Sequence, residues 1–65
     1  MEIKFCENLK NLRQSSKLTQ GQLAKVVGVD QRTISAWETG VCEPSFEMLL
    51  KLCQLFDEDF NGLLS

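Results

Sequence analysis

The stretch from residue 31 to residue 39, QRTISAWET, gathers hydrogen-bonding side chains at helical spacing. Gln31, Arg32, Thr33 and Ser35 all stand in its first two turns. A glutamine amide and an arginine guanidinium can each form two parallel hydrogen bonds with a flat polar edge, such as the edge of a nucleic-acid base. The side chains of this stretch therefore favour polar recognition over catalysis.

A helical wheel divides the same stretch into two sides. Ile34 and Trp37 centre the apolar side, and Glu38 lies at its margin. The other side carries polar or small residues, namely Gln31, Arg32, Thr33, Ser35, Ala36 and Thr39. Small residues in the middle of that side permit close approach, although an ordinary solvated helix face remains an open alternative.

The elements that position this stretch also read as helices, because the apolar residues recur with helical periodicity nearly throughout the chain. Phe5, Leu9 and Leu12 form the stripe of a first helix that ends near Ser16. Thr19 begins TQGQ, the pattern of a capping box, and predicts a second helix over about 20–27. Asp30 and Gly40 are the expected cap and stop of the helix over 31–39.

Only two residues, Gly28 and Val29, separate the second helix from the cap of the third. So short a connection makes the two helices cross steeply and predicts a helix-turn-helix unit over about 20–39. Ser45 and Asp59 can cap a fourth helix and a short last helix. The fourth carries two apolar sets, Phe46, Leu49, Leu50, Cys53 and Phe56, and then Met48, Leu52 and Leu55. The chain is therefore expected to form one all-α domain over residues 1–65.

Composition excludes several classes of protein. With 65 residues, 43% hydrophobic content and 25% charge, the chain predicts one small folded domain and not a disordered segment. It contains no long apolar run and no apparent signal peptide, so a cytoplasmic protein without membrane contact is expected. No histidine is present and the three cysteines form no CxxC pair, so neither a metal nor a cofactor is expected.

Catalysis has no support in the sequence. No nucleophile stands beside a base, no glycine-rich phosphate loop is present, and no small-molecule ligand is evident. Reduced cysteines used as small apolar residues are the simplest interpretation. A redox sensor at Cys42, which falls in a predicted loop, is the minor alternative.

The formal net charge of −2 is unevenly distributed. Through Gly40 the chain has six basic and four acidic residues, whereas from Val41 onward it has one basic and five acidic residues. A polyanion such as DNA would therefore bind the first part of the chain.

The segments LRQSSKLTQGQLAKVVGVDQRTISAWETG and EPSFEMLLKLCQLF together resemble the Cro and phage-repressor type of helix-turn-helix proteins, the XRE family. The resemblance extends from about Leu9 to Leu64 and combines LTQ, the following LA, the Gly-Val turn, TIS-x-WE-x-G and P-S-x-x-x-L-L-K-L. It implies a compact five-helix bundle of the lambda-repressor-like type. In that fold the third helix lies in the major groove of double-stranded DNA, and the second crosses the DNA backbone.

The resemblance also implies roles for individual residues. The base-contacting residues are expected to be Gln31, Arg32 and Ala36, with Thr33 and Ser35 beside them. The phosphate contacts are expected at Gln20, at Thr39 and at the backbone of Gly40, and Arg13 with Glu38 matches a structural salt bridge. The loop Val41, Cys42, Glu43 lacks the cations that family members often carry there, which predicts modest affinity per monomer and a shallow salt dependence.

The expected function is a sequence-specific regulator of transcription, most simply a repressor. A homodimer, at least on DNA, would read a palindromic operator, because one monomer makes few base contacts. The expected dimer face comprises Met48, Leu52, Leu55, Phe60 and Leu64, unless the last helix covers this stripe within the monomer. The alternative function is a protein-interaction or antitoxin-like adaptor of the same fold with weak or no DNA binding.

Overall fold

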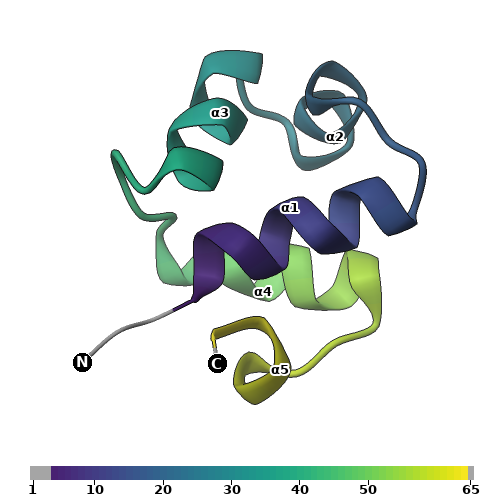
Figure 1. Cartoon of the computed structure of the whole chain (residues 1–65), viewed down its shortest axis with the longest axis vertical. Helices are drawn as coiled ribbons and strands as arrows, with labels where there is room; N and C mark the ends of the chain where they lie inside the picture. The colour runs from purple at the N-terminus through teal and green to yellow at the C-terminus, as the bar shows by residue number, and fades with distance from the viewer. Residues whose placement is uncertain (1–3, 65) are drawn as a thin grey trace.

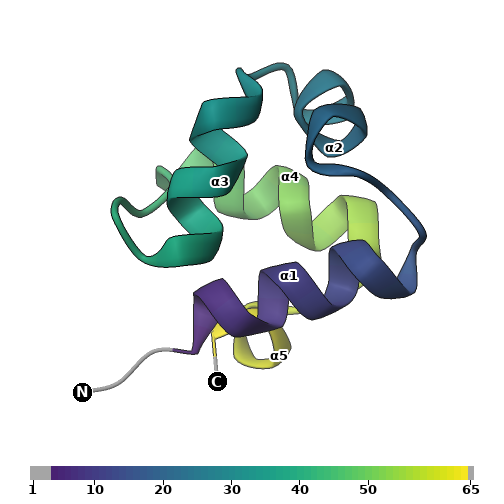
Figure 2. The same cartoon turned by 45° about the horizontal axis from the view of Figure 1, so that its top comes forward.

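The computed structural model describes residues 4–64, and within that range the chain forms five α-helices and no strand (Figure 1). The helices are α1 (Phe5–Ser15), α2 (Gln20–Val27), α3 (Gln31–Thr39), α4 (Phe46–Phe56) and α5 (Phe60–Leu64). In Figure 1, α2 and α3 lie together at the top, α1 crosses the middle in front of α4, and α5 lies at the bottom. In Figure 2, α4 is visible above α1 and partly behind α3. The predicted all-α fold is confirmed. None of the helices within these residues has the length and apolar character to span a membrane.

The helix boundaries follow from caps that the sequence predicts. The Thr19 hydroxyl accepts a hydrogen bond from the Gln22 amide at 3.0 Å, and the Gln22 side chain accepts one from the Thr19 amide at 2.8 Å. Side chains also cap the later helices, at Asp30, Ser45 and Asp59. Gly28 and Gly40 end α2 and α3 with φ of 89° and 80°, a conformation that glycine adopts without steric cost.

The core is shared by all the helices of residues 4–64. Each contributes one completely buried side chain, and these are Leu9, Leu23, Ile34, Leu52 and Leu63. Trp37 of α3 and Phe5 of α1 pack into the same cluster. A single core holds one buried side chain from each helix, and α3 packs directly against α1 and α2.

The prediction for α4 is wrong at Leu52. This residue was expected on an outward dimer face, yet its exposed fraction is 0%, and Met48 also packs against the core. Leu52 belongs to the buried core cluster, and α4 packs against both α2 and α5. The exposed apolar residues of α4 are Phe46, which is 65% exposed, Leu50, which is 40% exposed, and Leu55, which is 39% exposed. Of the α4 residues expected on the dimer face, only Leu55 is therefore exposed.

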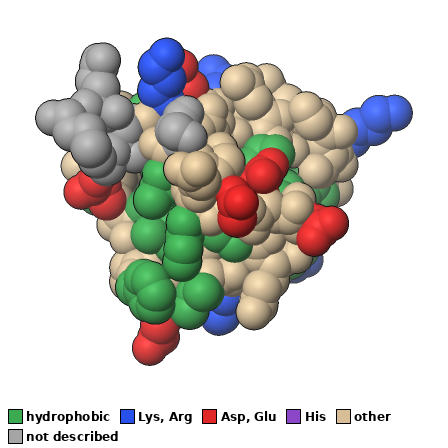
Figure 3. All heavy atoms as spheres, turned by 90° about the horizontal axis from the view of Figure 1, so that it is seen from below, with side chains coloured by type: hydrophobic (Ala, Val, Ile, Leu, Met, Phe, Trp, Pro, Cys, Tyr) green, Lys and Arg blue, Asp and Glu red, His purple; other side chains and the backbone are tan. Residues whose placement is uncertain are grey.

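The last helix covers part of α4, as the alternative interpretation held. The Asn8 side chain of α1 donates a hydrogen bond to the Leu63 carbonyl at 3.0 Å, which holds α5 against α1. The ring of Phe60 lies 5.5 Å from that of Phe46, centroid to centroid. An apolar surface still remains over α4 and α5, where Figure 3 shows hydrophobic side chains gathered on the underside of the molecule.

Candidate nucleic-acid interface

The α2–α3 pair forms the predicted helix-turn-helix unit. At the turn, the amides of Gly28 and Val29 both donate to the Ala24 carbonyl, at 2.8 and 2.9 Å. The pair is closed by buried side chains of α2, including Ala24 and Val27, against Ile34 of α3. The outer surface of α3 is therefore held at a fixed angle to α2.

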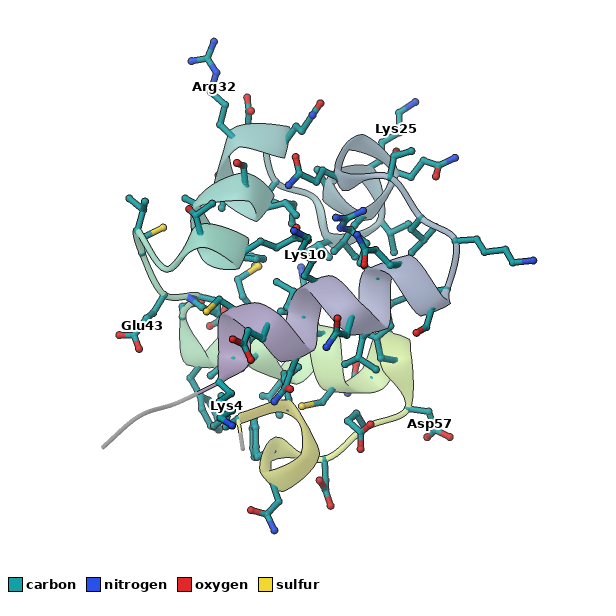
Figure 4. All side chains as sticks on the ribbon, viewed as in Figure 1. Lys4, Lys10, Lys25, Arg32, Glu43 and Asp57 are labelled. Atoms are coloured by element: carbon teal, nitrogen blue, oxygen red, sulfur yellow. The ribbon has the colours of Figure 1, made fainter. Side chains whose placement is uncertain are left out.

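The outward side of α3 carries the predicted base-contacting residues. Gln31 and Arg32 are exposed at its first turn, whereas Thr33, Ser35 and Ala36 are half-buried. Ile34 and Trp37 are buried, as the helical wheel predicts. Arg32 projects away from the body of the molecule at the end opposite α5 (Figure 4).

A polar network behind this surface joins the first three helices. The Arg13 guanidinium donates from Nε to Oε2 of Glu38 at 2.5 Å and from Nη2 to Oε1 at 3.0 Å. Nη1 donates to the Leu18 carbonyl at 2.9 Å. The predicted salt bridge between Arg13 and Glu38 is confirmed, and these side chains are only 11% and 3% exposed. Hydrogen bonding to Glu38 raises the pKa of Arg13, so the guanidinium stays charged.

Gln20 belongs to the same network. Its amide nitrogen donates to Oε1 of Glu38 at 3.2 Å, which ties the first residue of α2 to α3. A glutamine amide carries two N–H donors, so the second can still reach an anion at the helix N-terminus. The phosphate contact at Gln20 remains a prediction. The hydrogen bond to Glu38 would orient the Gln20 side chain for this contact.

At the other end of α3, the predicted phosphate contacts are occupied within the protein. The Thr39 hydroxyl lies 2.9 Å from the Ser35 carbonyl and donates to it. The Gly40 amide donates to the Ala36 carbonyl as part of the helix cap. A phosphate could bind the Gly40 amide only if this cap opened, so the structure does not present that amide as the sequence analysis expected.

Two lysines that sequence reasoning did not assign lie near this surface. Lys25 of α2 projects at the same end as Arg32, and Lys10 of α1 lies on the side of its helix toward α2 and α3 (Figure 4). Both are exposed. The sequence showed an excess of basic residues in the first forty positions. This excess indicated which part of the chain is basic, but not which surface of the fold carries the lysines. Glu43 and Asp57 lie away from the end that carries Arg32.

The polar side chains of this region are described by their possible ligands and partners. Among residues 4–64 no group of three or more potential ligand side chains could hold a metal ion. The buried polar side chains of that range all have hydrogen-bond partners. What remains available is a row of exposed or half-exposed donors and acceptors along α3 with cations beside it.

A steep helix pair whose second helix presents such a row defines a helix-turn-helix domain of the DNA-binding kind. The comparison of the sequence with family models agrees: the chain belongs to the helix-turn-helix family HTH_3, whose model matches residues 9–63. This confirms the resemblance drawn from the sequence motifs.

The relatives of the chain carry regulatory names. An uncharacterized HTH-type transcriptional regulator of Bacillus subtilis, YqaE, is 35% identical over 92% of this chain and 52% of its own length. Antitoxin PezA of Streptococcus pneumoniae is 33% identical over 89% of this chain and 37% of its own length. The chain thus spans about half or less of the length of these curated relatives.

Solved structures give the same fold. The crystal structure of a transcriptional regulator from Listeria innocua superposes with a TM-score of 0.93 at 28% identity, over 98% of this chain and 60% of that chain. Family, relatives and fold together place the chain among helix-turn-helix domains similar to those of transcriptional regulators.

Proposed function

We propose that this chain is a sequence-specific repressor that reads the major groove of double-stranded DNA with α3. The observation that carries the proposal is the division of α3 into a buried side and an outward side bearing Gln31 and Arg32. Arginine pairs with guanine and glutamine with adenine through two hydrogen bonds each. The domain would act in the cytoplasm, where it meets DNA.

Within the proposal, Thr33, Ser35 and Ala36 lie close to the bases, and their small size sets how deeply α3 enters the groove. Gln20 at the start of α2 contacts a phosphate, and Glu38 holds its amide in place for that contact. Lys25 and Lys10 add phosphate contacts along the same surface. These few cations, with none in the loop of residues 41–43, favour a modest affinity for each monomer.

Dimerisation on a palindromic operator follows from this modest affinity, because two half-sites sum their contacts. The surface offered for it is the α4–α5 patch, which we define as Phe46, Leu50 and Phe60. Helices α4 and α5, which carry these residues, lie at the end opposite Arg32 (Figure 4), and Figure 3 shows hydrophobic side chains gathered on the underside of the molecule. Half-buried Leu64, one turn after Phe60 on α5, can extend the contact. Leu55 is 39% exposed but follows Phe46 by nine residues, which places it on the opposite side of α4 from this patch.

The test begins with selection of bound sequences from a random pool of double-stranded DNA. We expect enrichment of a half-site that contains guanine and adenine, repeated with two-fold symmetry. Arg32→Ala should then weaken binding to the selected site by about 1–3 kcal/mol, or roughly 5–150-fold, with little effect on random DNA.

The matched control is Lys51→Ala, which removes an exposed cation from α4. It should leave the affinity for the selected site within about twofold. Equal losses for both variants would show that binding follows net charge and not base reading. A pool with no enriched sequence would refute the proposal.

The second candidate function is an adaptor that binds protein and has little affinity for DNA. It is favoured by the exposed α4–α5 patch and by the similarity to a protein named as an antitoxin. Two results together would support this candidate. No DNA sequence would be enriched from the pool, and the Arg32→Ala variant would bind a protein partner as tightly as the parent chain.

A further inference from the structure

A cavity of about 330 Å³ lies between the first turn of α1, the end of α3 and the loop that follows α3. Two of the three cysteines, Cys6 of α1 and Cys42 of the loop, line this same cavity. Its walls also include Phe5 and Trp37, and Trp37 is the only tryptophan of the chain. Residues 36 positions apart in sequence thus bring two thiols to one space next to α3, which Glu43 also lines.

The two thiols differ in access. Cys42 is exposed, Cys6 is half-buried, and both are free. The third cysteine, Cys53, is buried in the core and does not line the cavity. This combination, an accessible thiol with a second thiol behind it, is the arrangement in which an oxidised cysteine is resolved as a disulfide.

We propose that Cys6 and Cys42 form a two-thiol modification site that a hydroperoxide converts to an intramolecular disulfide. The sulfur of Cys42 attacks one peroxide oxygen, the O–O bond breaks, and the second oxygen leaves as water or alcohol. The resulting sulfenic acid at Cys42 is attacked by the sulfur of Cys6, and the S–O bond breaks with loss of water. Two thiols lose two protons and two electrons, and one peroxide is reduced.

The proposed bond requires a movement of the loop that carries Cys42. Residues 40–45 form no helix or strand, and this segment would bring Cys42 to the Cβ–Cβ separation of about 3.8 Å that a disulfide requires. The loop is also coupled to α3, because the amides of Val41 and Cys42 donate to the Ala36 carbonyl at 2.9 and 3.4 Å. Drawing Cys42 toward Cys6 pulls on the C-terminal cap of α3.

The first experiment measures the bond alone and needs no DNA. The reduced chain is treated with hydrogen peroxide under dilute conditions, and its intact mass should fall by two hydrogens. Peptide mapping should place the cross-link between Cys6 and Cys42. The fluorescence of Trp37 should change in parallel, since disulfides quench a nearby indole.

Two variants define the roles of the thiols. Cys6→Ser should leave the sulfenic acid of Cys42 unresolved, so that a dimedone probe labels residue 42 in this variant and not in the parent chain. Cys53→Ala is the matched control and should form the same cross-link at the same rate. Cross-linking between chains only, equal dimedone labelling with and without Cys6, or no reaction at Cys42 would each overturn the proposal.

A second readout rests on the proposed function. With a selected DNA site in hand, the oxidised chain should bind at least about tenfold more weakly than the reduced chain, and dithiothreitol should restore the affinity. Because mass and mapping report the disulfide independently, a failure of DNA binding and a failure of disulfide formation are separate results. A disulfide that leaves affinity unchanged would overturn the coupling to α3.

Discussion

The first three helices and the last two differ in what they leave uncovered. Among α1, α2 and α3, polar groups are paired inside, as the network of Arg13, Glu38 and Gln20 shows, and the exposed side of α3 is polar. On α4 and α5, the exposed surface includes Phe46 and Leu50. Charge follows the same division, with the basic excess before residue 41 and the acidic excess after it.

This difference indicates the partner of each region. A surface of hydrogen-bonding side chains with cations at its edge suits a polyanion with readable polar edges. An exposed phenylalanine beside a half-exposed leucine suits another apolar protein surface. The two regions therefore divide the work proposed for the domain, with DNA at one end and a second protein chain at the other.

The largest expected effect tests whether α1–α3 depend on their polar network. Glu38→Ala leaves the guanidinium of Arg13 buried without its carboxylate, which should lower the free energy of unfolding by about 3–5 kcal/mol. Such a loss is most of the stability of a 65-residue domain. Urea unfolding followed by circular dichroism measures it.

Glu47→Ala is the control, because Glu47 is an exposed acidic residue of α4. It should change stability by less than about 0.5 kcal/mol. The double variant Arg13→Met, Glu38→Leu should recover much of the loss, since an apolar pair leaves no buried charge. Equal losses in Glu38→Ala and Glu47→Ala would remove the distinction between the two regions.

The next effect tests the apolar region. Phe46→Asp places a charge in the α4–α5 patch, where it should weaken self-association roughly tenfold or more, about 1.4 kcal/mol or more. Sedimentation over a range of concentrations measures this. Val26→Asp is the matched control, because Val26 is 59% exposed but lies on α2. If only Val26→Asp weakened self-association, the dimer face would lie at α2 and not on α4 and α5.

Sequence reasoning predicted α1–α3 more fully than α4–α5, and the reason is physical. Helix caps are local, so TQGQ and the glycines at 28 and 40 place the boundaries without knowledge of the fold. The inward side of α3 follows from one helical period, because only one of its sides is apolar.

For α4, helical periodicity alone does not identify the buried side. Apolar residues occupy more than one side of this helix, and periodicity cannot say which of them the neighbouring helices cover. In the structure Leu52 is buried in the core that α4 shares with the other helices, whereas Phe46 is exposed. The hydrogen bond from Gln20 to Glu38 and the shared cavity of Cys6 and Cys42 likewise join distant residues, so no local pattern contains them.

A smaller effect compares how the two regions end their principal helices. Gly40 ends α3 and Asp57 ends α4, both with positive φ, 80° and 53°. An L-residue pays about 1 kcal/mol for this conformation, so Asp57→Gly should stabilise the domain by about 0.5–1 kcal/mol and Gly40→Ala should destabilise it by about 1 kcal/mol. Thermal unfolding measures both. Destabilisation by Asp57→Gly would show that the Asp57 side chain contributes more than its backbone strain costs.

The smallest effect concerns the thiol in the core of α4. Burial, with added repulsion from Asp59 and Glu58, raises the pKa of Cys53 above its ordinary value. In the unfolded chain the thiol ionises near pH 8.5, while in the folded chain it keeps its proton to higher pH. The contribution of Cys53 to the free energy of unfolding is therefore fully present below about pH 8.5. It decreases as the pH rises above this value, by at most about 1.4 kcal/mol per pH unit. Under reducing conditions, urea unfolding of Cys53→Ala between pH 7 and 10 should lose this decline, whereas Cys42→Ser should retain it. If Cys53→Ala lost stability with rising pH to the same extent, the alkaline sensitivity would come from groups other than Cys53.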